Sequence, residues 1–173
     1  NNMIRKITPA NVVSLFAGQP AAGYINAAVN LTNGVYGAFR NPSGIATDAS
    51  GNVYVADLGN SAIRQITPAG VIITIAGGPV QASLLGYPAG ITIDKNGNFF
   101  ITDESGRIIE LTSTKVLYVL AGASNISGFS DGVGLAAIFN TPIGIAADQL
   151  GNIYVADSNN NRIRQVVVTS TQP

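Results

Sequence analysis

The chain has 173 residues, of which 46% are hydrophobic and only 10% are charged, and its formal net charge is zero. This balance provides no electrostatic attraction to nucleic acid or anionic lipid, so neither is expected as a partner. The sequence has no cysteine and no histidine, which excludes disulfides and removes the commonest metal ligand and general base. No run of about 18 apolar residues is present, so no segment is expected to span a membrane.

The first elements along the chain are two short β-type runs within residues 1–18. Residues 2–9 match residues 60–68, and residues 12–18 match residues 71–77. Because the later copies follow two other strand-like runs, the chain is expected to open on the third and fourth strands of a repeated unit.

A 17-residue pattern then occurs three times, at 41–57, 87–103 and 141–157. Each copy contains Pro-x-Gly-Ile, then Asp-x-x-Gly-Asn, then an apolar run that ends in Asp. A repeat period of about 50 residues suits a four-stranded propeller blade better than a short solenoid turn.

Each repeat divides into four predicted strands. The first strand is small and apolar, as the crowded centre of a propeller requires, and Asp-x-x-Gly-Asn has the chemistry of a hairpin turn. The second strand is β-branched and aromatic. The predicted first strands are 44–47, 90–93 and 144–147; the second are 53–56, 99–102 and 153–156; the third are 63–66, 108–111 and 163–168; the fourth are 71–76 and 115–121.

These elements predict one all-β unit over residues 1–173, a β-propeller of four-stranded blades with about three blade equivalents. Its parts are strands three and four of a split blade at 1–18, complete blades at 42–77 and 88–122, and strands one to three of a split blade at 142–168.

The repeated motif, with Ile-Arg on the third strand and Gly-Phe-Ser-Asp-Gly-x-Gly within 128–140, resembles the NHL repeat. The resemblance implies a β-propeller, most often six-bladed. Members include cell-surface sensor domains, protein- and RNA-binding modules and one metal-dependent amidating lyase, so fold does not fix function. The second repeat departs from the pattern, because Ile109 stands where the other repeats have Arg64 and Arg164.

One acidic and one basic residue recur per repeat, and the pattern indicates a structural lattice of hydrogen bonds or ion pairs between neighbouring strands. The predicted lattice consists of Asp57, Asp103, Asp157, Arg5, Arg64 and Arg164. Asp48, Asp94 and Asp148 are interpreted as turn caps.

Asp131 is a weak candidate for a Ca²⁺ ligand, because a lone carboxylate among glycines cannot supply the 6–8 oxygens of such a site. No catalytic residue and no cofactor are predicted, since the sequence has no histidine that could activate a serine. Basic residues do not cluster, which argues against RNA binding.

The loops between blades carry two further groups of candidates. Tyr24, Tyr36 and Phe129 either form a rim for a glycan or peptide or pack the loops down. Asn30 and Asn125 begin Asn-x-Ser/Thr sequences, so either is a possible glycosylation site.

Three blades cannot close a propeller, whose usual range is about four to eight blades. The hypothesis is that another copy supplies the missing strands, with residues 12–17 pairing beside the last strand of the neighbouring chain. Two copies then close a six-bladed ring, or the contact propagates as a filament. The alternative is that the sequence is part of a longer propeller. The predicted contact residues are Ile4, Ile7, Val12, Val13, Leu15, Phe16, Ile163, Val166 and Val168.

Three functions compete. The first is a non-enzymatic extracellular structural or interaction protein that assembles with other copies of itself. The second is a ligand-binding sensor or adhesion propeller for a glycan or peptide, and the third is an enzyme with a carboxylate-only metal site. Low charge, abundant Asn and Thr, and the absence of Cys and Trp favour a location outside the cell or at its surface.

Overall fold

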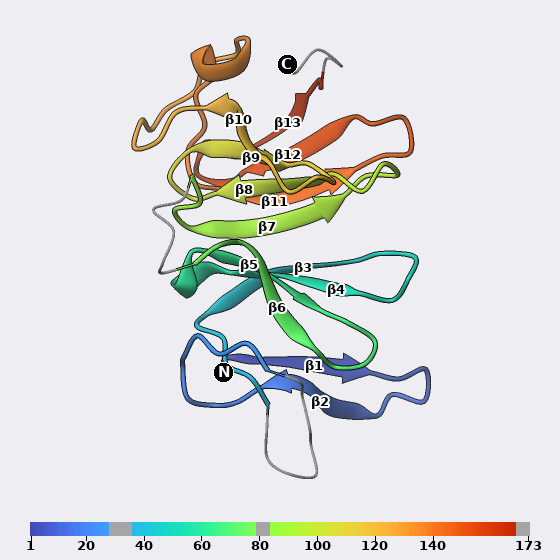
Figure 1. Cartoon of the computed structure of the whole chain (residues 1–173). Coiled ribbons are helices and arrows are strands. Elements are labelled where there is room, and N and C mark those ends of the chain that lie inside the picture. The colour runs from blue at the N-terminus through green and yellow to red at the C-terminus, as the bar shows by residue number, and fades with distance from the viewer. Residues whose placement is uncertain (28–35, 79–83, 169–173) are drawn as a thin grey trace.

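The computed structural model describes residues 1–27, 36–78 and 84–168, which form four antiparallel β-sheets stacked in chain order (Figure 1). The hairpin at the N-terminus and the sheet nearest the C-terminus lie at opposite ends of the stack. In this described part the only helices are three short 3-10 turns, and none could cross a membrane. The all-β propeller architecture expected from the sequence is therefore confirmed.

The sheets contain two, four, four and three strands, and we call them the first to fourth sheets. The first is β1 (Met3–Ile7) and β2 (Val13–Gly18); the second is β3 (Pro42–Thr47), β4 (Val53–Asp57), β5 (Ala62–Ile66) and β6 (Ile72–Gly77). The third is β7 (Pro88–Ile93), β8 (Phe99–Asp103), β9 (Arg107–Leu111) and β10 (Leu117–Gly122); the fourth is β11 (Pro142–Ala147), β12 (Ile153–Asp157) and β13 (Arg162–Val166).

Several predicted strand ends were wrong by a few residues. The innermost strands begin at the proline of the repeat rather than at its glycine. Strand β10 begins two residues later than predicted, because Lys115 has a φ of 69° and lies in the turn. Strand β13 ends at Val166, two residues before the predicted end.

The repeated glycine of the first strand allows the sheets to approach at the centre of the stack. A Cβ atom on Gly44 would lie 2.4 Å from the carbonyl oxygen of Ala89 in the next sheet. On Gly90 it would lie 2.2 Å from the carbonyl oxygen of Ile143, again in the next sheet. Since side chains do not fit at these distances, glycine is required where β3, β7 and β11 converge.

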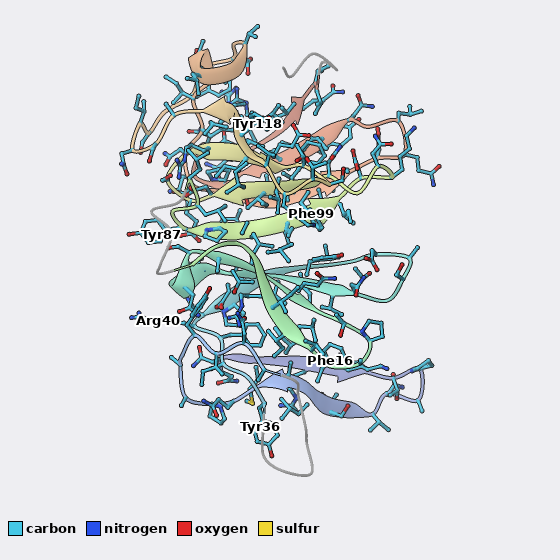
Figure 2. The ribbon with its side chains drawn as sticks, viewed as in Figure 1. Phe16, Tyr36, Arg40, Tyr87, Phe99 and Tyr118 are labelled. Carbon is cyan, nitrogen blue, oxygen red and sulfur yellow. The ribbon has the colours of Figure 1, made fainter. Side chains whose placement is uncertain are left out.

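Side chains that alternate along each strand fill the space between sheets. Phe99 packs edge-on against Tyr54 of the second sheet, with ring centroids 4.6 Å apart, while Phe100 belongs to the cluster shared with the fourth sheet. Figure 2 shows Phe16 between the β1–β2 hairpin and the second sheet, and Phe99 between the second and third sheets. Each sheet thus buries its side chains against its neighbours.

Asp48 forms the predicted turn cap between β3 and β4. Its Oδ1 accepts hydrogen bonds from the backbone N–H groups of Ser50 and Asn52, and its Oδ2 accepts one from the Asn52 amide. The hydrogen bond from the Asn52 side chain leads the effects that lower the pKa of Asp48. Equivalent backbone bonds hold the turns of Asp94 and Asp148, so the three hairpins share one construction.

Candidate functional site: the loop clamps and the open end of the stack

Arg64 is completely buried and joins strand β5 to the loop that precedes β3. Its Nη1 donates to Asp57 Oδ2 at 2.8 Å, and its Nη2 donates to the carbonyl oxygen of Ile25 and to Asn26 Oδ1. Asp57 also accepts hydrogen bonds from Asn60 and from the backbone of residue 40. Burial raises the pKa of Asp57, and these donors oppose that rise.

The fourth sheet repeats the same clamp. Arg164 donates to Asp157, to the carbonyl oxygens of Ile138 and Ser130, and to Asp131 Oδ1 at 2.7 Å. Asp157 accepts a further hydrogen bond from Asn160. In both sheets, therefore, an arginine on strand three fastens an inter-blade loop to the blade that follows it.

Two aromatic rings enclose each guanidinium group. Arg64 lies 4.8 Å from the ring centroid of Tyr24 and 5.2 Å from that of Phe39. Arg164 lies 4.9 Å from Phe129 and 4.3 Å from Phe139. Such cation–π contacts stabilise a desolvated arginine.

In the third sheet the repeated aspartate also forms an ion pair, but with an arginine at another position of strand three. Asp103 forms its ion pair with Arg107, at the start of β9, and accepts backbone hydrogen bonds from Gly86, Tyr87 and Ser105. Burial disfavours ionisation of Asp103, but these donors outweigh it and lower its pKa. The third sheet has Ile109 at the position of Arg64 and Arg164, and its arginine lies two residues earlier, at position 107.

Arg5 does not take part in the lattice, and its inclusion was wrong. Among the described residues strand β1 pairs with β2 alone, so no described strand two provides the carboxylate that Asp57 provides in the second sheet. Arg5 is exposed and has no hydrogen-bond or ion-pair partner among residues 1–27, 36–78 and 84–168. The prediction failed because the repeat of the arginine does not imply a repeat of its partner.

The other predicted site residues have varied surroundings. Asp131 forms an ion pair with Arg164 although 82% of its side chain is exposed, and no group of three or more potential metal ligands occurs in the described residues. Asn125 is exposed, with a φ of 61°, and Asn30 lies outside the described residues.

The predicted ligand rim is not one continuous patch. Tyr24 packs on Arg64 in the second sheet and donates or accepts a hydrogen bond with Thr74. Phe129 packs on the arginines of the fourth sheet and is 43% exposed. Tyr36 lies at the hairpin end of the stack (Figure 2), and the third sheet separates this end from Phe129.

Sequence reasoning missed Arg107, the two asparagines Asn60 and Asn160, and the second aromatic of each clamp. The asparagines donate to the carbonyl oxygens of Gly23 and Gly128, which lie in the clamped loops. Their spacing of three residues after the repeated Asp was visible in two repeats and could have identified them.

The outer edge of β13 differs from the corresponding edges of the complete sheets. Strand β5 pairs with β6 from Ala62↔Gly77 to Ile66↔Ile72, and β9 pairs with β10 in the same way. Among the described residues no strand pairs with β13 on this side. Its backbone N–H and C=O groups are therefore available to another strand.

The face of the fourth sheet that points away from the third is also open. The equivalent residues Ile63 and Ile108 are both 0% exposed, whereas Ile163 on β13 is 75% exposed. Tyr54 is 5% exposed and its equivalent Tyr154 is 38% exposed. This face has the composition of a buried layer but lacks a covering sheet.

A cavity of about 360 Å³ lies beside the open edge, lined by Ala121, Phe139, Val166 and Val167 among others. The corresponding position in the second sheet is filled by Ile72 at the start of strand four, which packs with Ala17, Phe39 and Ile66. The cavity therefore lies where the first side chain of a fourth strand would pack.

The opposite end of the stack is open as well. Ile45 is 53% exposed, whereas its equivalent Ile91 is 5% exposed, because no strand of the first sheet covers it. A recess of about 260 Å³ lies between β1 and the second sheet, with Ile4, Phe16 and Val53 in its wall. Val13 on β2 is 51% exposed, although its equivalent Ile72 is 1% exposed.

The placement of the predicted contact residues follows from these two ends. Exposed side chains are Ile7, Val12, Val13 and Ile163; partly buried ones are Ile4, Leu15, Phe16 and Val168; Val166 is buried.

A family model described as NHL repeat matches residues 39–66 and 139–166. Two segments of the chain are therefore similar to the NHL repeat. Both matched segments begin at one of the two aromatic residues that pack on the clamp arginine and end with strand three. The NHL pattern therefore includes the arginine and its aspartate, but not the loop that they fasten.

The curated protein SUPPRESSOR OF QUENCHING 1, chloroplastic, from Arabidopsis thaliana is 28% identical over 175 residues, which cover 90% of this chain and 16% of that protein. The chain thus spans a small part of this relative.

Two solved structures from Bacteroides thetaiotaomicron share the fold. A structural genomics protein of unknown function matches with a TM-score of 0.74 and 24% identity, over 95% of this chain and 42% of that one. An auxiliary nutrient binding protein matches with a TM-score of 0.68 and 17% identity, over 95% of this chain and 39% of that protein's chain. Each neighbour is more than twice as long as the part that this chain matches.

Enzymes also occur among the structures with this fold, including a virginiamycin B lyase from Staphylococcus aureus at a TM-score of 0.57 and 15% identity. At this identity the match shows the fold alone. The fold therefore occurs in proteins described as binding proteins and in proteins described as enzymes, and it does not by itself decide the function.

Proposed function

We propose that this protein is a non-enzymatic interaction protein that assembles with other copies of itself by completing its propeller. The observation that carries the proposal is the exposure of Ile163, whose equivalents in the second and third sheets, Ile63 and Ile108, are fully buried. Burying one such side chain contributes about 1.5–3 kcal/mol, so the open face favours a covering sheet.

The two ends of the stack are complementary in the way that neighbouring sheets are. Tyr54 and Ile63 of the second sheet share a cluster with Ile91 and Phe99 of the third. The fourth sheet offers the equivalents of the first pair, and the second sheet offers Ile45 as the equivalent of Ile91. A second copy can therefore place its second sheet against the fourth sheet of the first copy.

Such a contact is head-to-tail, because it joins different surfaces of the two copies. If two copies close, they form a ring with two-fold symmetry, and if the angle does not close they form a filament. A location outside the cell is part of the proposal, supported by the low charge content of 10% and the absence of cysteine.

The test is the mass of the purified chain by light scattering over a range of concentrations. We expect the mass to rise above 17.7 kDa and Ile163→Asp to return it to that of one chain. Leu150→Asp is the matched control, because Leu150 is 86% exposed in the turn between β11 and β12, and it should not change the mass. A folded single chain at every concentration would contradict the proposal.

A second candidate is binding of a small polar ligand, such as a glycan, beside Phe129. The observation that favours it is an open recess of about 380 Å³, lined by Phe129, Asp131 and Arg162 among others. Loss of glycan-array binding in Phe129→Ala, with assembly unchanged, would support this candidate over the first.

A further inference from the structure

The first sheet contains a strand that occupies the position a second copy would need. Strand β1 pairs with β2 in the register Met3↔Gly18, Ile4↔Ala17, Arg5↔Leu15, Lys6↔Ser14 and Ile7↔Val13. This register matches that of β5 with β6, including the irregularity after the second pair. Thus β1 holds the strand-three position beside β2, which is the same position that β13 holds in the fourth sheet.

We infer that β1 is a displaceable strand that covers β2 in the single chain, and that β13 of a second copy replaces it on assembly. This inference rests on the proposed self-assembly and names the strand exchanged. It predicts the register of the new pair, in which Gln165 of one copy lies opposite Ser14 of the other.

The contacts of the two strands favour the replacement. Arg5 has no carboxylate partner in the described residues, whereas Arg164 is held by Asp157 and Asp131 and enclosed by two aromatic rings. Strand β13 is also fixed to β12 along its whole length, from Ile153↔Val166 to Asp157↔Arg162. Strand β1 has one neighbour in its sheet, so its removal breaks one ladder only.

The exchange also provides a buried position for Val13. In the single chain Val13 is 51% exposed and lies opposite Ile7, which is 67% exposed. In the exchanged pair Val13 takes the position of Ile72 and enters the cavity of about 360 Å³ beside Phe139 and Val166. The occupant that fits this cavity is thus the β2 strand of a second copy, whose own sequence repeats the Ala-Gly ending of β6 and β10.

Two disulfide variants of the full chain test the inference, and the absence of native cysteine makes them unambiguous. Lys6→Cys with Ser14→Cys joins the partners of the β1–β2 pair and locks β1 in place. We expect the oxidised variant to need at least ~10-fold higher concentration to assemble than the same variant after reduction, because β1 is then no longer displaceable.

Ser14→Cys with Gln165→Cys tests the register. Position 14 lies in β2 and position 165 lies in β13, and Figure 1 shows these strands at opposite ends of the stack of sheets. A disulfide between the two positions therefore joins two copies. We expect a covalent dimer if the ring closes, or a ladder of larger products if a filament forms. Ser14→Cys alone is the control and should not give these products beyond random dimerisation.

The outcomes separate the inference from the proposed function. If the chain assembles but the oxidised lock assembles equally well, β1 is not displaced and the inference fails while self-assembly stands. If the assembled chain does not cross-link through Ser14→Cys and Gln165→Cys, the register is wrong. If the wild-type chain never assembles, both the function and the inference are overturned.

Discussion

At the scale of single residues, the loop clamps decide how one sheet is joined to the next. Repetition of Asp and Arg in the sequence predicted such contacts, and the ion pairs of Asp57 and Asp157 lie where the pattern indicated. Repetition did not predict Arg107, because the third sheet moves the arginine within its strand. Nor did it predict that Tyr24 and Phe129 enclose arginines, because their loops differ in length and hide the equivalence.

Replacement of Arg64 tests the clamp. Because Arg64→Ala leaves the carboxylate of Asp57 buried without its ion partner, we expect the free energy of unfolding to fall by about 3–5 kcal/mol. Arg5→Ala, at the equivalent but exposed position, should change it by less than about 0.5 kcal/mol. Urea unfolding of both variants makes the comparison, and equal effects would mean that the clamp contributes nothing beyond the strand position.

At the scale of single elements, the turns were the most predictable part of the fold. Asp and Gly at fixed positions specify the hairpins at 48–52, 94–98 and 148–152, because the carboxylate binds the backbone of the turn and Gly51 has a φ of 80°. Strand ends were less predictable. Lys115 and Asn11 adopt positive φ values in the turns before β10 and β2. Lysine rarely takes this conformation, so the sequence did not indicate that Lys115 belongs to the turn.

The turn of Asp48 gives a prediction on pH. The hydrogen bond from the Asn52 side chain is the largest cause of the lowered pKa of Asp48, so Asn52→Ala should raise that pKa toward its ordinary value of 3.8. A carboxylate with a lowered pKa stabilises the fold above its unfolded pKa and loses this effect as pH falls through its folded pKa. In Asn52→Ala this pH-dependent stabilisation should therefore be smaller, and its loss should be complete at a higher pH than in the wild type. NMR titration of the Asp48 carboxyl carbon measures the shift, and an unchanged pKa would exclude the hydrogen bond as its cause.

At the scale of the whole molecule, the repeat period predicted the stack of sheets, while the exposure of each sheet face appeared only in the structure. The glycine of the innermost strand shows the difference. Gly44 and Gly90 each meet the backbone of the next sheet, but the nearest atom to a Cβ on Gly144 is Cβ of Ala156 in its own sheet, at 3.3 Å. All three glycines lie in the same Pro-x-Gly-Ile motif. The sequence therefore does not indicate which of them has a neighbouring sheet.

Alanine at these glycines should therefore have two different effects. Gly90→Ala crowds Ile143 within the chain and should lower the free energy of unfolding by about 1–3 kcal/mol. Gly144→Ala should leave the single chain almost as stable as wild type but weaken assembly, since its methyl group would meet the backbone of the second copy. Thermal unfolding and light scattering of both variants test this, and unimpaired assembly of Gly144→Ala would argue against the proposed contact.

The third sheet lies between two sheets of three or more strands, with Phe99 and Ile109 packed toward one neighbour and Phe100 and Ile108 toward the other. In an array held together by nearest-neighbour contacts, the end units open first and the middle one last. Amide protons of β8 should consequently exchange with solvent most slowly, and those of β1 fastest. The molecule would then lose its order inward from both ends, and slower exchange in β13 at rising protein concentration would report that this end has been covered by a second copy.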